Sequence, residues 1–222
     1  MNCAAIIVAA GRSARMGFDK LTAQLAGTSV LQRSLDALAS SGLFREIVLV
    51  TPQDRFSLLD LPDFPVHQVE GGRERHLSVV EGLNALTGQP DLVAIHDGAR
   101  PLVSSEMIAE CIQAAKEHGA ATLARRVTET IKKAGEHGFT MGSIPRENLW
   151  VMETPQTFRT STLQRAYEGI IRENITVTDD VSAVETLGIP TKLVENTSPN
   201  PKITLPGDLA VATAILESCE SL

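Results

Sequence analysis

Short apolar runs alternate with amphipathic segments through the first half of the chain. Consecutive apolar residues predict buried strands at residues 4–9, 46–51 and 92–96, and a shorter strand at 66–69. Apolar residues at helical spacing predict helices over 30–38 and 75–86. Ser104 is expected to cap another helix, which runs to about Lys116 and stops at Gly119, before a strand at 120–124. This alternation predicts an α/β fold with a mostly parallel sheet.

The alternation breaks between residues 127 and 144. Two β-type segments flank Gly135 to Gly138, which predicts a β-hairpin. The hairpin has few core-sized side chains and no helix beside it, so we expect it to project from the body. We therefore expect a single domain over residues 1–222 with a dimerisation arm at about 126–147. Beyond the arm we predict strands at 149–152 and 192–194 and a helix at 162–172. We expect a second helix to run from an N-cap at Thr178 to Gly188, and a third to span 206–216 with Thr204 as its cap.

Composition and charge narrow the class of protein. The 222 residues are 43% hydrophobic and 21% charged, which is typical of a soluble globular protein. The net charge of −7 argues against a nucleic-acid binder, so any anionic ligand must meet locally clustered cations. No apolar run approaches the roughly 20 residues of a membrane helix, and the chain begins with a strand rather than a leader. We expect no membrane partner.

The cysteines indicate a reducing compartment. Cys3, Cys111 and Cys219 are an odd number, lie far apart and form no CxxC pair. This pattern disfavours a disulfide framework and a structural zinc site. We therefore expect a cytoplasmic protein with reduced thiols.

A segment of small and basic residues, AAGRSARMG at 9–17, follows the first strand directly. Small residues let the backbone approach a ligand, and successive N–H groups can cradle phosphate oxygens. Arg12, Arg15 and Lys20 repel one another unless an anion binds between them. The segment matches neither GxGxxG nor a Walker A loop. A phosphate site is the favoured interpretation, and a solvent-exposed glycine-rich turn is the alternative.

Two later segments could complete a ligand site. Gly71 and Gly72 precede a helix with Ser78 in its first turn, and they could admit a base or sugar; a plain turn before a helix is the alternative. Asp97 ends a strand within HDGARP, where its carboxylate could bind Mg²⁺; capping of the next turn is the alternative. His96 fits a hydrogen-bonded core residue better than a catalyst. Ligands of parallel sheets bind at strand carboxyl ends, so these segments should meet.

Taken together, the motifs resemble those of one family. The segments AAGRSARMG, GGRERHLSV, HDGARP, ETPQTF, TDDVSAVE and NPKITLPGDL, spread over residues 9–208, are similar to those of 2-C-methyl-D-erythritol 4-phosphate cytidylyltransferases. The first motif alone would indicate only a sugar-phosphate nucleotidylyltransferase. There is one departure: the family usually has Pro-Lys-Gln a few residues after Arg-Met-Gly, whereas here Asp19-Lys20-Leu21 stands one residue closer. Lys20 is the lysine available for that role.

The resemblance implies a Rossmann-like nucleotidyltransferase fold whose arm builds a homodimer. It implies transfer of a cytidylyl group from CTP to a polyol phosphate, 2-C-methyl-D-erythritol 4-phosphate, with release of pyrophosphate and with Mg²⁺ as cofactor. The catalytic residues that it implies are Arg15, Lys20 and Lys202, with Asp97 placing the metal. The nucleotide-binding residues are Ala9, Ala10, Gly11, Gly72, Arg73 and Ser78. The acceptor-binding residues are Arg100, Thr154 and Thr178, joined by Thr130 and Arg146 from the arm of the neighbouring chain.

Other functions remain open on sequence grounds. The nearest is a ribitol 5-phosphate cytidylyltransferase, with the same mechanism and another polyol; a nucleotidyltransferase that uses GTP or UTP is further away. A non-catalytic nucleotide-binding module would have no need of cations at three separate sequence positions. An NAD-dependent oxidoreductase is disfavoured because GxGxxG is absent from the first turn.

Overall fold

A seven-stranded sheet forms the centre of the computed structural model, which describes residues 1–11 and 16–220. Its order is β11-β7-β10-β6-β1-β4-β5. The strands are β1 (Cys3–Val8), β4 (Ile47–Val50), β5 (Val66–Val69), β6 (Leu92–Asp97), β7 (Ala120–Arg126), β10 (Trp150–Arg159) and β11 (Lys192–Glu195). Every strand runs in the same direction except β10, which is antiparallel to β6 and β7. The predicted mostly parallel α/β sheet is confirmed.

The chain changes direction across the sheet between β1 and β6. From β1 it moves outward to β4 and β5, and then returns to add β6 on the other side of β1. The carboxyl ends of β1 and β6 therefore flank the point where the strand order reverses, which is where open α/β sheets bind ligands.

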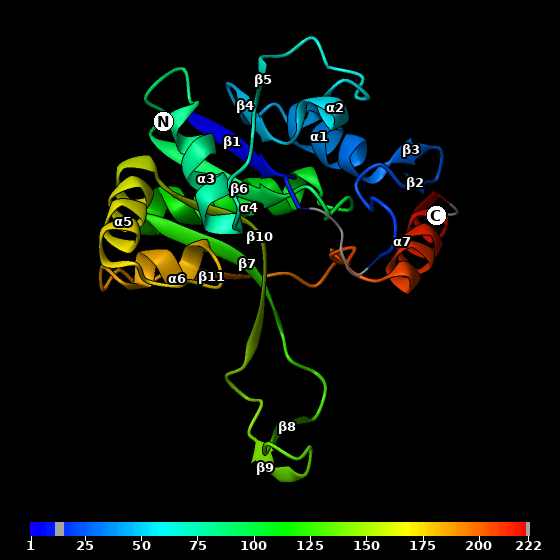
Figure 1. Cartoon of the computed structure of the whole chain (residues 1–222), viewed down its shortest axis with the longest axis vertical. Coiled ribbons are helices and arrows are strands. Elements are labelled where there is room, and N and C mark those ends of the chain that lie inside the picture. Colours follow the sequence, from blue (N-terminus) through cyan, green and yellow to red (C-terminus); the bar gives the residue numbers. More distant parts are fainter. Residues whose placement is uncertain (12–15, 221–222) are drawn as a thin grey trace.

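Helices cover both faces of this sheet (Figure 1). One face carries α1 (Val30–Ser40) and α4 (Ser105–His118), and the other carries α3 (Arg75–Asn84), α5 (Thr160–Glu173) and α6 (Asp180–Glu185). At the edges lie the short α2 (Gln53–Phe56) and α7 (Pro206–Glu220), the latter beside β2 (Gln24–Leu25) and β3 (Thr28–Ser29). Within the described part of the chain, no helix is long and apolar enough to cross a membrane.

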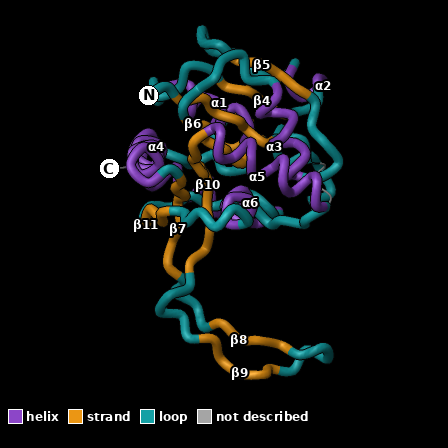
Figure 2. Tube along the Cα trace, turned by 90° about the vertical axis from the view of Figure 1, so that its left-hand side faces the viewer, coloured by secondary structure: helices purple, strands orange, loops and turns teal. Residues whose placement is uncertain are grey.

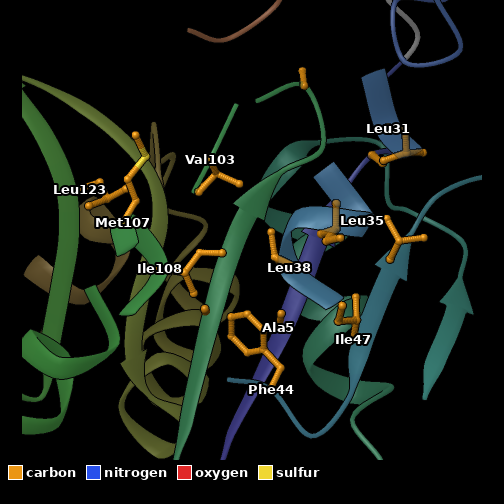
Figure 3. Close-up of a cluster of buried hydrophobic side chains, with 14 of the residues drawn as sticks. Ala5, Leu31, Leu35, Leu38, Phe44, Ile47, Val103, Met107, Ile108 and Leu123 are labelled. Atoms are coloured by element: carbon orange, nitrogen blue, oxygen red, sulfur yellow. The ribbon is translucent and has the colours of Figure 1, made fainter. Parts of the chain in front are cut away.

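Two hydrophobic clusters hold the three layers together. Ala5 and Ile47 pack with Leu35 and its neighbours from α1 on one face, as Figure 3 shows. Ile6, the next residue along β1, belongs to the opposite cluster with α3 and α5. Successive side chains of a strand point to opposite faces, so a strand that is buried on both faces reads as an unbroken apolar run. This is why the parallel strands were visible in the sequence.

The predicted hairpin is a projecting arm. Beyond the sheet, the chain from β7 to β10 leads to β8 (Ile131–Ala134) and β9 (Thr140–Ile144), which pair at the far end of the arm (Figures 1 and 2). Its apolar side chains are exposed: Phe139 by 79% and Met141 by 69%. A lone two-stranded hairpin is marginally stable in water. The arm therefore presents apolar side chains that its own chain leaves exposed.

Helix caps were predicted with mixed success. Ser104 accepts from the Met107 N–H at 3.3 Å, as predicted, and Gly119 ends that helix with a φ of 87°. Thr178 is not the N-cap of α6, because Asp179 caps it by accepting from the Ser182 N–H at 2.9 Å. Thr204 does not cap α7 with its side chain either. The carboxylate of Asp208 reaches back and accepts from the backbone N–H groups of Thr204 and Leu205 at 2.7 and 2.8 Å.

Candidate active site

A cleft of about 870 Å³ opens at the carboxyl ends of β1 and β6. It brings together segments that the sequence analysis selected separately. The predicted site residues that line it are Ala9, Ala10, Gly11, Lys20, Gly72, Arg73, Ser78, Asp97 and Lys202. Arg15, the remaining predicted catalytic residue, lies outside the described residues.

Two loops meet closely along the wall of the cleft. A Cβ on Gly71 would stand 2.2 Å from the Cβ of Ala10 and 2.9 Å from the Oγ of Ser78. A Cβ on Gly72 would stand 2.4 Å from the Cβ of Leu77. Only glycine fits at either position while the backbones keep these places. The small residues therefore let the loop after β1 and the loop before α3 pack together, which leaves backbone groups of both loops at the cleft.

Asp97 lies among three cationic side chains at the cleft. Its Oδ2 lies 2.7 Å from the Nζ of Lys202 and 3.8 Å from the Nε of Arg100, and its Oδ1 lies 3.3 Å from the Nε of Arg75. Burial alone would raise the pKa of Asp97, but the three cations outweigh burial and hold this pKa well below its usual range. Asp97 is thus a fixed anion that faces the cleft cations, rather than a cap on the next turn.

A buried hydrogen-bonded chain places the backbone of Asp97. The Asp97 N–H donates to the Oγ1 of Thr154 at 3.0 Å, and that hydroxyl lies 3.1 Å from the Nδ1 of His96. The Nε2 of His96 lies 3.2 Å from the carbonyl of Arg100, which can only accept, so Nε2 carries the proton and Thr154 donates to Nδ1. Burial lowers the pKa of His96 to about 4, so the ring is neutral. His96 is a hydrogen-bonded core residue, as expected.

A bulge in β10 delivers Thr154 to this position. Between Met152 and Gln156 the pairing with β7 shifts, because β10 carries two more residues there than β7 does. Bulges re-aim side chains next to active sites. The hydroxyl of Thr154 is used inside the protein, and its side chain is buried at 2% exposure. Its predicted contact with the acceptor stays a prediction.

Arg100 links the Asp97 loop to the segment that carries Lys202. It is buried, and its Nη1 donates to the Asn200 carbonyl at 2.6 Å. The Nδ2 of Asn200 donates in turn to the carboxylate of Glu153 at 3.2 Å. Lys20 donates to the carbonyl of Ile203 at 2.7 Å, next to Lys202. The structure therefore brings the two predicted catalytic lysines to one side of the cleft. Binding of the acceptor by Arg100 stays a prediction.

The remaining predicted acceptor residues lie elsewhere. Thr178 is exposed beside a small hollow of about 90 Å³ that is also lined by Glu74 and Arg75, both of which line the main cleft as well. Thr130 and Arg146 are on the arm, where Arg146 donates to the Thr128 carbonyl. Among the described residues, neither of these two lines the cleft of its own chain. Their role in a neighbouring chain's site stays a prediction.

An arginine that no sequence motif reveals holds the ends of the glycine-rich loop. Arg55, on the unpredicted helix α2, donates to the carbonyl of Ala9 and, at 3.5 Å, to that of Gly11. Its Nη2 also lies 2.8 Å from the Oδ2 of Asp19, beyond the loop. We call this set of contacts the loop clamp. No local spacing reveals it, because Arg55 lies 36 residues from Asp19.

Two further residues at the site were missed: Arg75, which lines the cleft, and Asp180, which is buried behind it. Arg75 lines the cleft from the first turn of α3, where the helix dipole disfavours a cation. A basic residue at that place signals an acidic partner, and its Nη2 lies 2.7 Å from the Oδ2 of Asp180 on α6. Asp180 is 105 residues away in sequence. The position of Arg75 at a helix start therefore indicates that it has an acidic partner, but it does not identify that partner as Asp180.

One carboxylate of the cleft, that of Asp97, could serve as a ligand of a magnesium ion. Within residues 1–11 and 16–220, no group of three or more His, Cys, Asp or Glu side chains could hold a metal ion. Mg²⁺ commonly takes only one or two carboxylates and completes its shell with substrate phosphates and water. The carboxylate of Asp97, facing a cleft with several cations for phosphates, fits that arrangement.

Comparisons with known proteins agree with this geometry. The sequence profile of the 2-C-methyl-D-erythritol 4-phosphate cytidylyltransferase family matches residues 3–218. Proteins of that name from Pelotomaculum thermopropionicum and Geobacillus kaustophilus are 39% and 41% identical to this chain; the alignments cover 97% and 98% of the chain and 94% and 98% of those proteins. The crystal structure of a 4-diphosphocytidyl-2C-methyl-D-erythritol synthase from Anaerococcus prevotii superposes with a TM-score of 0.86 at 30% identity, over 97% of this chain and 98% of that one. The chain therefore belongs to the 2-C-methyl-D-erythritol 4-phosphate cytidylyltransferase family.

Proposed function

We propose that the chain transfers the cytidylyl group of CTP to 2-C-methyl-D-erythritol 4-phosphate and releases pyrophosphate. The observation that carries the proposal is the pairing of Asp97 with Lys202 in a cleft walled by two small-residue loops. Full-length similarity to cytidylyltransferases favours this acceptor over ribitol 5-phosphate.

The chemistry needs no covalent nucleophile from the protein. The acceptor is a phosphomonoester whose second pKa is near 6, so it is mostly dianionic at pH 7. One of its oxygens attacks the α-phosphorus of CTP, a new P–O bond forms, and the bond from that phosphorus to the α,β-bridging oxygen breaks. Pyrophosphate leaves with the electron pair of the broken bond. What the protein must supply is positioning and neutralisation of charge between two anions.

The cleft residues supply both. Lys202, whose side chain is 40% exposed beside Asp97, is suited to face the α-phosphoryl group where the charge grows. Lys20 and Arg15 would hold the triphosphate and the leaving pyrophosphate. Asp97 would hold Mg²⁺, which, when bound, neutralises charge on phosphoryl oxygens. The closely packed loops at Ala10 and Gly71 would receive the ribose and cytosine through backbone groups.

The arm supports a homodimer that shares its sites. Its exposed Phe139 and Met141 would be buried against a second chain, and two-fold symmetry would bring each arm to the neighbour's body. Arg146 and Thr130 would then add contacts to the acceptor phosphate in the neighbouring site. We also propose a cytoplasmic location, because Cys3 and Cys111 are buried free thiols of the kind that a reducing compartment maintains.

A substrate survey tests the function. Pyrophosphate release is measured with each of four nucleoside triphosphates against 2-C-methyl-D-erythritol 4-phosphate and ribitol 5-phosphate, with Mg²⁺ or with EDTA. We expect the fastest turnover with CTP and the methylerythritol acceptor, and none in EDTA. Equal or faster reaction with ribitol 5-phosphate would move the assignment to the other polyol, and activity that survives EDTA would remove the metal.

A further inference from the structure

A fully buried carboxylate stands behind the cleft. Asp180, the first residue of α6, has no solvent exposure. Its Oδ2 lies 2.7 Å from the Nη2 of Arg75, and its Oδ1 accepts the hydroxyl of Tyr167. Its backbone N–H donates to the Oε1 of Gln156 at 3.1 Å. The carboxylate is therefore fixed through both oxygens and through its own backbone.

Arg75 carries this fixed position into the cleft. Its Nη2 is held by Asp180, while its Nε lies 3.3 Å from the Oδ1 of Asp97. The guanidinium group is planar and rigid, so two partners at different nitrogens define its orientation. Asp180 thus holds one end of the Arg75 guanidinium, and the other end contacts the Oδ1 of Asp97, whereas Lys202 pairs with the Oδ2.

The pair also joins two parts of the site. Arg75 begins α3, directly after the loop of Gly72 and Arg73 at which the nucleotide is expected. Asp180 begins α6, two residues after Thr178, an expected acceptor contact. One ion pair therefore fixes the nucleotide loop relative to the acceptor loop.

Stability alone is a weak reason for such a pair. Removing the charge of Asp180 from water costs several kcal/mol, whereas the side chain of Arg75 keeps 28% of its exposure, and apolar replacements of buried pairs are often neutral or stabilising. Here the cation also stands at a helix start, where the dipole opposes it. An arrangement that is costly on both counts is better explained by the orientation that it imposes.

We propose that Asp180 is a positioning residue for the transfer reaction, acting through Arg75 to set Asp97 and to fix the nucleotide loop relative to the acceptor loop. The inference rests on the proposed function, and it names a residue that touches neither substrate.

A double-mutant cycle tests the proposal on the full chain. Asp180→Asn, Arg75→Gln and the double variant are compared by kcat/KM with the substrate pair that the wild-type chain uses fastest. A misplacement of about 1 Å in a site can cost about a hundredfold in rate. We therefore expect each single variant to lose roughly ten- to a hundredfold, and the double variant to lose no more than Arg75→Gln. Losses that multiply in the double variant would show that Asp180 acts independently of Arg75, and would overturn the proposal.

Two controls separate positioning from folding. Tyr167→Phe removes the other partner of Asp180 and leaves its ion pair with Arg75, so we expect a lower melting temperature with kcat/KM within about threefold of wild type. If Tyr167→Phe loses as much kcat/KM as Asp180→Asn, the role is structural only. Arg75→Lys keeps the charge but has one nitrogen in place of the Nε and Nη2 that contact the two carboxylates, so it should not reach wild-type kcat/KM. Should Asp180→Asn not fold, wild-type kcat/KM in Arg75→Lys would overturn the proposal.

The survey of wild-type substrates keeps the two proposals apart. A wild-type chain that prefers another nucleotide or polyol phosphate refutes the proposed function, while the mutant cycle on the preferred pair still decides the role of Asp180.

Discussion

Replacing Arg55 by methionine would remove the loop clamp and keep most of the side-chain volume. In the wild-type chain the guanidinium donates to the carbonyls of Ala9 and Gly11 on one side of the glycine-rich loop. On the other side it pairs with Asp19 at 2.8 Å, next to Lys20. Without the clamp the two ends of the loop lose their common partner.

The size of the effect follows from these contacts. A hydrogen bond to a charged group contributes about 1.5–3 kcal/mol. The clamp makes two separate anchorages, one to the carbonyls and one to the carboxylate, but the side chain of Asp19 is 34% exposed and water compensates part of its loss. We expect the free energy of unfolding to fall by about 2–4 kcal/mol. In a domain of this size that lowers the melting temperature by roughly 10 °C.

The chain offers a matched control. Arg33 donates to two backbone carbonyls, those of Leu25 and Ala26, at 2.7 and 2.8 Å, away from the cleft lining. Thermal unfolding and steady-state kinetics are measured for Arg55→Met and Arg33→Met. We expect both to lose stability, and only Arg55→Met to raise the KM for CTP, by at least about tenfold, since the clamp positions the glycine-rich loop that we propose holds the triphosphate. Unchanged KM and kcat in Arg55→Met, alongside a similar loss of stability in both variants, would refute the role of the clamp in nucleotide binding.

Three further predictions concern the lysine, the arm and the thiols. Lys202→Ala should lower kcat about a hundredfold or more, or about 2.7–4 kcal/mol, with a smaller change in the KM for CTP; a change in that KM alone would make Lys202 a binding residue. Arg146→Ala chains mixed with Lys202→Ala chains should recover about a quarter of wild-type activity, because half of randomly mixed dimers carry one intact site; no recovery despite subunit exchange would mean that Arg146 serves its own chain. Burial raises the pKa of Cys3 and Cys111 to about 12, so in a Cys219→Ser chain iodoacetamide should label them only on unfolding. Their ionisation in the unfolded chain should also lower stability as the pH rises from about 9 toward 12, and rapid native labelling or flat stability over that range would contradict their burial.

The sequence predicted best those elements whose residues are apolar on both faces. The strand at 4–9 was recognisable because Ile6 and Ile7 serve opposite clusters. The predicted strand at 149–152 was too short, since β10 continues to Arg159. Its later residues include Glu153, Thr154 and Gln156, which are buried although polar. Their partners lie on other elements, so local polarity suggested a loop where tertiary contacts make a strand.

The site residues that could be predicted from the sequence are those in motifs that directly follow a predicted strand. The carboxyl end of β6 placed Asp97, and the glycines at 71 and 72 marked a close approach that the structure shows. The residues that hold the site were not predictable in this way. Arg55 acts from a four-residue helix, and Arg75 meets Asp180, which is 105 residues further along the chain. Long-range ion pairs leave no periodic trace in a single sequence.

The strand pairs on the arm side of the β10 bulge make the arm an exchangeable module. On the arm side Met152 pairs with Ala124, and on the core side Gln156 pairs with Thr122. A one-residue slip in a regular strand would turn every following side chain to the opposite face. Here the pairs Trp150–Arg126 and Met152–Ala124 fix the register of β10 before the bulge, so Thr154 and Phe158 keep their faces whatever the arm contains. Arms of different length could therefore be grafted between Arg126 and Trp150 from one relative to another, while the cleft keeps its register.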